Sequence, residues 1–205
     1  GYISVSATSA SSASSAYGAY AVGIESDSIS GTITNTSTGE ISVYAESVAY
    51  TGYTLATAMG ISADYLTGDI TNEGLIEARA FADVFAEAAG IEAVDISGSI
   101  TNSGIIKAHA FGDEDTSAES ASAAGITAVY GNIAGNITNS GTIESIASAT
   151  SEAEAFGVYA EYVISGDITN SGTIKAMATA GYSAYAAGID AELISGTITN
   201  TSTGV

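Results

Sequence analysis

The chain has 205 residues, a length that suits one domain or one stretch of a repeat array. Its 23 acidic and 3 basic residues give a formal net charge of -20, which argues against nucleic acid and anionic membranes as partners because both would be repelled. The absence of cysteine excludes disulfide bonds and thiol chemistry, and no apolar run reaches the roughly 20 residues that a membrane-spanning helix needs.

The chain opens with GYISVSA (1–7), in which apolar and polar residues alternate as in a half-buried strand. A second alternating run surrounds Gly23, and a third, ISGTITN (29–35), follows it. The same three segments then recur in this order along the chain, which makes it a repeat of a three-strand unit. The string G-x-I-T-N recurs every 30 to 37 residues and ends at Asn35, Asn72, Asn102, Asn139, Asn170 and Asn200.

Three strands per repeat without long linkers predict an all-β, single-domain parallel β-solenoid (β-helix) over residues 1–205, in which each repeat forms one turn. We expect about six turns of 30–37 residues, about three strands per turn and a right-handed coil. The extra length of the longer turns is expected in residues 46–60 and 111–125. FADVFAEAAG (81–90) has a helix-like composition but no 3.6-residue period, so we expect a strand there. A propeller is the alternative architecture, although its blades need four strands.

The alternation also predicts which residues point inward. Ile29, Gly31, Ile33 and Asn35 share one side of their strand, and we place that side in the core. The six repeat asparagines then stack as an amide ladder, in which each side chain bonds to the turns above and below it. The strand type that opens the chain adds an inward isoleucine column, made of Ile3, Ile41, Ile76, Ile106, Ile143 and Ile174.

On the outward side, one column is predicted to form a charge ladder of Glu77, Lys107, Glu144 and Lys175. Stacked neighbours lie about 4.8 Å apart, so alternating signs attract and favour this register over a slip of one residue. Other acidic residues are expected to face neutral residues of the adjacent turns.

No group of residues predicts catalysis or a cofactor, so we expect that the chain is not an enzyme. Arg79 and His109 stack in an outward column, yet a lone histidine is more often a surface residue than a base. Asp113, Glu114 and Asp115 are the candidates for a calcium site, but they lack the D-x-D-x-D-G spacing, and a solvated acidic loop is the preferred interpretation.

Two further outward features give predictions: a face of serine and threonine hydroxyls, and the glycosylation sequons. The serine and threonine face is similar to the hydroxyl rows of ice-binding solenoids, although Asp69 and Asp167 interrupt one of its columns. N-x-S/T sequons occur at Asn35, Asn136 and Asn200, and Asn136 is the one that we place on the outside.

The repeats ISGSITNSGII (96–106) and ISGDITNSGTI (164–174) resemble the β-helix repeats of bacterial surface proteins, including autotransporter passengers and adhesin-like proteins. The resemblance covers essentially the whole chain. It implies a β-helical fold and an extracellular or cell-surface location, and it carries over no functional residues.

Neither end of the chain has a capping signature, so we expect a solenoid that is uncapped at both ends. SGTITNTSTG occurs at 30–39, where EISVYA follows it, and again at 195–204, while the chain opens with YISVSA. We therefore expect the structural subunit of an extracellular filament that polymerises head to tail with copies of itself. The alternative is a fragment of a longer adhesin- or autotransporter-type stalk. The expected junction residues are Tyr2, Ile3, Val5, Ile194, Ile198, Asn200 and Val205.

Overall fold

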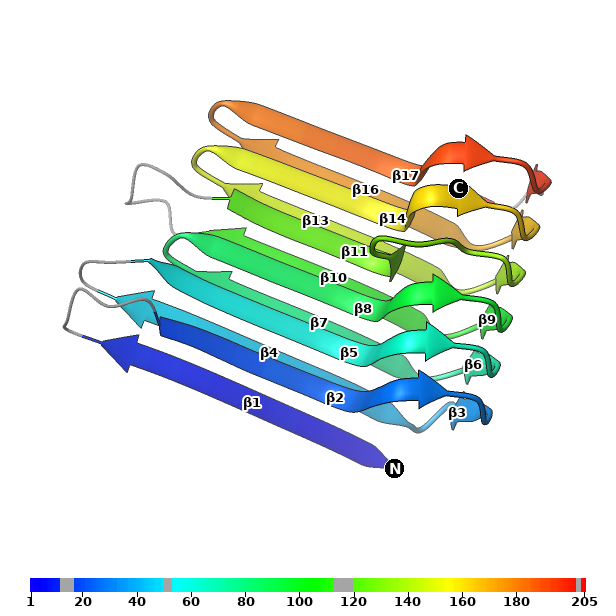
Figure 1. The fold of residues 1–205 in the computed structure, drawn as a ribbon, viewed down its shortest axis with the longest axis horizontal. Coiled ribbons are helices and arrows are strands. Elements are labelled where there is room, and N and C mark those ends of the chain that lie inside the picture. Colours follow the sequence, from blue (N-terminus) through cyan, green and yellow to red (C-terminus); the bar gives the residue numbers. More distant parts are fainter. Residues whose placement is uncertain (12–16, 50–52, 113–119, 202–203) are drawn as a thin grey trace.

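The computed structural model describes residues 1–11, 17–49, 53–112, 120–201 and 204–205 (Figure 1). These residues form three parallel sheets of six strands each, and every turn contributes one strand to each sheet. The prediction of a parallel β-solenoid with six turns and three strands per turn is therefore confirmed. The described ranges contain no helix that is long and apolar enough to cross a membrane.

The sheets are numbered by the order in which a turn passes through them. Sheet 1 contains β1 (Tyr2–Ser11), β4 (Glu40–Ala49), β7 (Leu75–Ala82), β10 (Ile105–Gly112), β13 (Thr142–Ala149) and β16 (Thr173–Ala180). Sheet 2 contains β2 (Tyr17–Ile29), β5 (Thr54–Leu66), β8 (Phe85–Ile96), β11 (Ser120–Ala128), β14 (Glu152–Ile164) and β17 (Ser183–Ile194). Sheet 3 contains β3 (Ile33–Asn35), β6 (Ile70–Asn72), β9 (Ile100–Asn102), β12 (Ile137–Asn139), β15 (Ile168–Asn170) and β18 (Ile198–Asn200).

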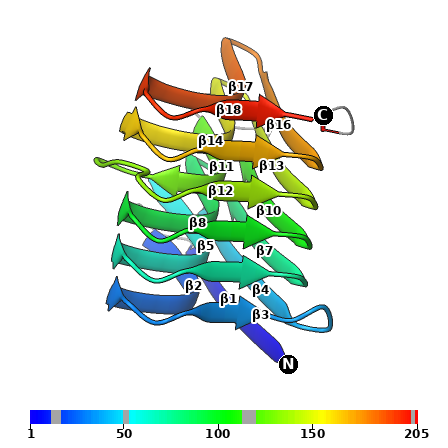
Figure 2. The same cartoon turned by 90° about the vertical axis from the view of Figure 1, so that its right-hand side faces the viewer.

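The coil is right-handed, as expected. In Figure 2 sheet 3 faces the viewer, and its strands run from sheet 2 on the left to sheet 1 on the right while the turns rise from the N-terminus to the C-terminus. A path that rises while its front side runs from left to right is a right-handed coil. The chain segment 81–90 contributes to strands β7 and β8, as its lack of a helical period predicted.

Equivalent residues of successive turns lie side by side, because every sheet is parallel and in register. The alternating isoleucines and alanines therefore form inward columns, and internal members such as Ile76, Ala80 and Ile100 are almost wholly buried. Alanine is the commonest buried residue, so the interior between sheets 1 and 2 is thin. The inward placement predicted for the isoleucine and asparagine columns is confirmed in the internal turns.

One glycine column of sheet 2 exists because of this thin interior. A Cβ atom added to Gly90 would overlap Cγ2 of Ile106 in sheet 1 and lie 2.7 Å from the carbonyl oxygen of Gly125. The glycines at the same place in four other turns, Gly23, Gly60, Gly125 and Gly157, meet the same two obstacles. The landmark glycine of each repeat is thus a packing requirement and marks the closest approach of the two sheets.

The extra length of one long turn is distributed differently from the prediction. Between β10 and β11 the chain contains residues 113–119, as expected for the variable segment, and these lie outside the described residues. A second insertion, however, lies after β11, where Tyr130 adopts a left-handed φ of 65°. Ile133 then returns to the column of Ile96 and Ile164, so the stacking resumes beyond the insertion.

The glycine column yields a test of the packing. Gly90→Ala should lower the free energy of unfolding by roughly 1–3 kcal/mol, as overpacked cores usually do. The matched control is Gly188→Ala, at the same place in the last turn, where the nearest atom to an added Cβ is 4.0 Å away. Urea unfolding followed by circular dichroism measures both; equal stability of the two variants would contradict this account of the column.

Candidate functional site: the two ends of the coil

The asparagine ladder runs through the whole coil at the end of sheet 3. Each Nδ2 donates a hydrogen bond to Oδ1 of the asparagine in the following turn, with donor–acceptor distances of 2.7–2.9 Å. Each Nδ2 also donates to a main-chain carbonyl of the following turn, as Asn102 does to Thr142 at 3.1 Å. The predicted ladder is confirmed, and because every amide points the same way, it has a direction. Its members are Asn35, Asn72, Asn102, Asn139, Asn170 and Asn200.

This direction makes the two ends of the ladder different. Asn35 stands first and turns its Nδ2 toward Asn72, so its Oδ1 faces the N-terminal end of the coil. Asn200 stands last and accepts from Asn170, so its Nδ2 is the group at the C-terminal end, where it donates to the carbonyl oxygen of Gly204 at 3.1 Å. One end of the coil therefore offers an amide acceptor and the other an amide donor.

We name the open edges of β1, β2 and β3 the N-terminal end surface. The open edges of β16, β17 and β18, together with Val205, are the C-terminal end surface. They lie at opposite ends of the stack (Figure 1). No strand or helix of the described residues covers either surface.

Core residues are exposed at both surfaces. Ile198 is 44% exposed, whereas Ile168, one turn earlier in the same column, is 1% exposed. Ile3 is 39% exposed, whereas Ile41 in the next turn is 3% exposed. The columns continue to each end of the coil. Their end members are exposed because no neighbouring turn covers them.

Each end surface also contains a hollow that opens into the core. The hollow at the N-terminal end has a volume of about 490 Å³, and Ile3, Ile24, Ile33 and Asn35 line part of it. The hollow at the C-terminal end has a volume of about 180 Å³ and is lined by Asn170, Ile174, Gly188, Ile189, Ile198, Asn200 and Val205. Both hollows thus combine isoleucines with an asparagine of the ladder.

The structure places the predicted junction residues on these two surfaces. Tyr2 and Ile3 are exposed on β1, and Val5 is partly buried against the core. The other predicted residues, Ile194, Ile198, Asn200 and Val205, are exposed at the opposite end. Sequence reasoning missed the contribution of Ile24 and Gly188, although their places in the repeat could have indicated it.

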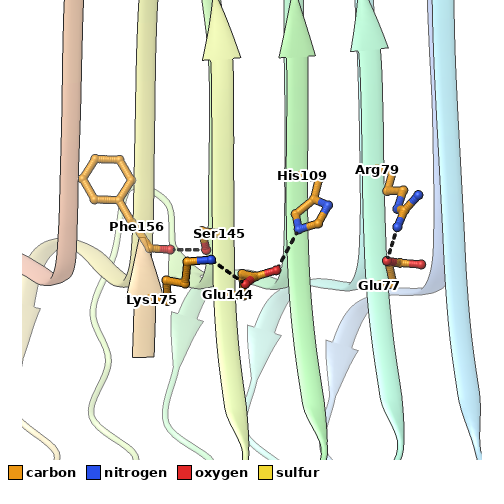
Figure 3. A network of polar contacts seen from close by, with 7 residues as sticks. All are labelled: Glu77, Arg79, His109, Glu144, Ser145, Phe156 and Lys175. Atoms are coloured by element: carbon orange, nitrogen blue, oxygen red, sulfur yellow. Dashed lines mark hydrogen bonds and ion pairs between the residues drawn. The ribbon is translucent and has the colours of Figure 1, made fainter. Parts of the chain in front are cut away.

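The charge ladder on the outside of sheet 1 has the predicted register, because Glu77, Lys107, Glu144 and Lys175 are neighbours in successive strands. The ion pairs differ from the prediction in part (Figure 3). Glu144 binds Lys175 at 3.0 Å as expected, but Glu77 binds Arg79 of its own strand at 2.8 Å. Lys107 has no ion pair among the described residues. The charges of alternating sign therefore lie in the predicted register, although only Glu144 and Lys175 form an ion pair within the ladder.

His109 is a structural member of this cluster. Its Nε2 lies 3.3 Å from Oε1 of Glu144, and burial lowers the pKa of the imidazole, so at neutral pH the contact is a hydrogen bond from a neutral ring (Figure 3). Burial alone would raise the pKa of Glu144, but the hydrogen bonds from Lys175 and His109 together lower it. Behind this surface the buried Ser145 donates to the carbonyl oxygen of Phe156 at 2.6 Å and so links sheets 1 and 2.

Acidic residues mostly face neutral neighbours, as predicted. Oδ1 of Asp69 accepts a hydrogen bond from the main-chain N–H of Ser99 at 2.8 Å, one turn away. Two contacts are exceptions. Asp27 lies in the same column as Asp64 because the residues on either side of the two are paired, and Glu192 lies opposite Glu161 at the bulge after Ala160.

The threonine column of the predicted ice-binding face is regular along sheet 3. The column beside it contains Asp69 and Asp167, and both carboxylates accept main-chain N–H groups of the next turn. Ice binding stays a prediction. Asn136 is exposed, and its Oδ1 accepts the N–H of Asp167 at 2.8 Å.

The calcium candidates Asp113, Glu114 and Asp115 lie outside the described residues. Within the described ranges, no group of three or more acidic or histidine side chains is arranged to hold a metal ion.

A cleft on the outside of sheet 2 was not predicted. Glu87 and Glu92 face each other across a hollow of about 150 Å³ whose floor includes Ala89 and Ala124. Burial raises the pKa of both carboxyls, and for Glu92, where Glu87 adds to the effect, it reaches about 7. The signal available in the sequence was the pair of small residues before Gly90, where burial stops alternating along the strand.

No family model, no curated protein and no solved structure matches this chain.

The ladder can be tested by removing one internal amide. Asn102→Ala should lower the free energy of unfolding by about 2–3 kcal/mol, because buried partners on both sides lose their hydrogen bonds. Asn200→Ala at the open end should cost less than about 1 kcal/mol, since water can replace its partners there. Chemical unfolding of both variants measures the difference. A similar loss of unfolding free energy in the two variants would contradict a stabilising role for the internal ladder.

Glu92 should make stability depend on pH. Its pKa rises on folding from 4.5 to about 7, so the folded chain holds the proton more tightly, and stability falls as pH rises from about 4.5 to about 7. Glu92→Gln should remove this loss and raise stability at pH 8 by about 2–3 kcal/mol relative to the parent chain. Thermal melts between pH 4 and 8 measure the effect, and parallel pH profiles of the two proteins would contradict it.

Proposed function

We propose that the chain is the structural subunit of an extracellular filament, in which the C-terminal end surface of one copy is covered by the N-terminal end surface of the next. The single observation that carries this proposal is that the two surfaces are the opposite sides of the same internal contact. The equivalents of the residues exposed at each end are buried in the turns that have a neighbouring turn on both sides. The extracellular location rests on the resemblance of the repeats to those of bacterial surface proteins.

The internal register defines how the two copies would fit. β1 of the next copy lies on β16, β2 on β17 and β3 on β18, so each sheet gains a strand. Ile3 of the next copy then stacks on Ile174 as Ile41 stacks on Ile3 within one copy. The exposed isoleucines and the open strand edges are covered together, which is strand addition in three sheets at once.

The asparagine ladder favours this orientation over the others. In the head-to-tail stack, Nδ2 of Asn200 meets Oδ1 of Asn35 of the next copy, which repeats the bond between Asn170 and Asn200. Joining two C-terminal surfaces would bring donor to donor, and joining two N-terminal surfaces would bring acceptor to acceptor. A contact between two different surfaces leaves one of each free, so it generates an open filament.

Two residues would occupy the same position in the proposed stack, namely Val205 of one copy and Tyr2 of the next. The N–H of Val205 donates to the carbonyl oxygen of Gly172, and its carbonyl accepts from Ile174, so Val205 already occupies the column of Thr173 in a seventh turn. Tyr2 occupies that column in the first turn. In the filament one of these two residues pairs with Thr173 and the other turns outward.

Two glycines allow the proposal to be tested without disturbing the subunit. A Cβ at Gly31 meets no atom within 4 Å, and one at Gly188 meets its nearest atom at 4.0 Å, because each lies at an open end. Internal glycines at the same places, such as Gly98 and Gly157, have no room for a Cβ against the neighbouring turn. Gly31→Ala and Gly188→Ala should therefore fold normally and fail to stack.

The measurement is the length of particles seen by electron microscopy of the purified chain, with sedimentation velocity as the solution check. We expect rods many times longer than one coil for the parent chain and single coils for each alanine variant. Mixing a small fraction of either variant into the parent chain should shorten the rods, since it ends growth at one side. Single coils of the parent chain under all conditions, or rods of unchanged length from both variants, would overturn the proposal.

A second candidate is a longer covalent solenoid, such as an adhesin stalk, and one observation favours it. GAYAVGIESDSISGTITNTSTG (18–39) and SAYAAGIDAELISGTITNTSTG (183–204) are close copies, so the last turn repeats the first. A covalent continuation that repeats the second turn would cover the same end surface, and no second residue would compete with Val205 for its position. Rods formed by the purified 205-residue chain favour the filament, and their absence favours the covalent solenoid.

A further inference from the structure

The proposed stack brings acidic residues of two copies together on the outside of sheet 2. Within one copy, no two acids are neighbours in the column of Glu25, which continues through Ser62, Glu92, Thr127, Tyr159 and Asp190. When β2 of the next copy is added to β17, its Glu25 becomes the direct neighbour of Asp190. The spacing of parallel strands places the two residues about 4.8 Å apart along the stack.

A second acidic pair forms beside the first. Ala191 and Ile194 occupy the columns of Ser26 and Ile29, so Glu192 occupies the column of Asp27. Glu192 and Asp27 are both exposed at their own end surfaces. The stack therefore sets two carboxylates of one copy against two of the next, and like charges directly opposite each other weaken strand pairing.

Two tyrosines hold part of this cluster in place. The hydroxyl of Tyr20 donates to Glu25 at 3.2 Å, and that of Tyr185 donates to Asp190 at 3.0 Å. Burial and the nearby Glu25 raise the pKa of Tyr20 to about 12, and the hydrogen bond to Asp190 raises the pKa of Tyr185, so both stay neutral. Because the two tyrosines share a column, the stack places one hydroxyl–carboxylate pair directly on the other.

No positive charge offsets these carboxylates. Arg79, Lys107 and Lys175, the three basic residues of the chain, all lie in sheet 1. Besides Tyr20 and Tyr185, the other titratable groups of sheet 2 that act on the cluster or pair with it are Asp64, Glu87, Glu92, Glu154, Tyr159 and Glu161. All of them are acidic or phenolic, so the junction is the most strongly like-charged contact that the stack creates.

We infer that this junction is an electrostatic gate on filament growth, an inference that rests on the proposed function. At neutral pH and low salt, the pairs Glu25–Asp190 and Asp27–Glu192 oppose stacking of copies. Salt screens exposed charges over a distance that falls from about 30 Å at 0.01 M to about 3 Å at 1 M ionic strength. Raising the salt concentration therefore strengthens the contact, and we expect about a tenfold gain in association across that salt range.

Charge reversal at one end and at both ends tests the gate. Asp190→Lys with Glu192→Lys places two ammonium groups against Glu25 and Asp27 of the next copy, so this variant should form long rods at low salt. Adding Glu25→Lys and Asp27→Lys makes the facing groups alike again, so the four-site variant should return to short particles at low salt. If the net charge of the chain governed assembly, the four-site variant would form the longest rods.

A matched control separates the junction from the other acids of the chain. Glu73→Gln with Glu152→Gln alters two exposed acids that do not neighbour the cluster and should leave the salt dependence of the parent chain unchanged. Asp190→Asn with Glu192→Gln, which changes the charge by the same amount and keeps side-chain size, should remove much of that dependence. Circular dichroism confirms that each variant is folded, and rod length against sodium chloride concentration is the readout.

The outcomes distinguish the gate from the filament itself. Rods of the parent chain that are equally long at all salt concentrations, or a four-site variant that grows like the two-site reversal, would overturn the gate and leave the filament standing. If no variant forms rods at any salt concentration or pH, the proposed stacking is wrong and the gate falls with it.

Discussion

Every feature of this fold depends on the stacking of equivalent residues in successive turns at the spacing of one strand. At about 4.8 Å, a side chain has its own counterpart as its nearest neighbour on both sides. Residues that bond well to copies of themselves are thereby favoured in the columns, as the asparagine ladder shows with an unbroken line of amide hydrogen bonds. Isoleucine packs on isoleucine for the same reason, and glycine recurs where two sheets leave no space for a Cβ atom.

The same constraint gives the coil a direction and two unequal ends. A parallel stack has no internal symmetry that would make its first and last turns alike. Asn35 therefore presents an acceptor where Asn200 presents a donor. A surface of this kind is satisfied by its opposite and not by itself, which is the physical argument for the proposed head-to-tail filament. A helical cap would satisfy it equally well, and the described residues contain none.

Charge opposes the proposed association of copies. A chain with a net charge of -20 and all its basic residues in one sheet keeps its broad faces apart from those of other copies. At the ends, the apolar and hydrogen-bonding surfaces of the core favour contact while the acids at the rim of sheet 2 oppose it. The balance between a short-range attraction and a screened repulsion would make such a contact responsive to salt.

The sequence alone determined the repeat, the three strands of each turn, the register and the inward columns, because period-two alternation and a regular spacing report directly on a parallel stack. It also determined the asparagine ladder and the neighbours of Glu144. The tertiary structure decided what depends on distances between sheets: that Gly90 faces Ile106, that Glu77 turns to Arg79 and away from Lys107, and that Glu87 and Glu92 flank a cleft. These contacts depend on the thinness of the interior and on the distances between side chains, and a one-dimensional pattern of polar and apolar residues gives neither quantity.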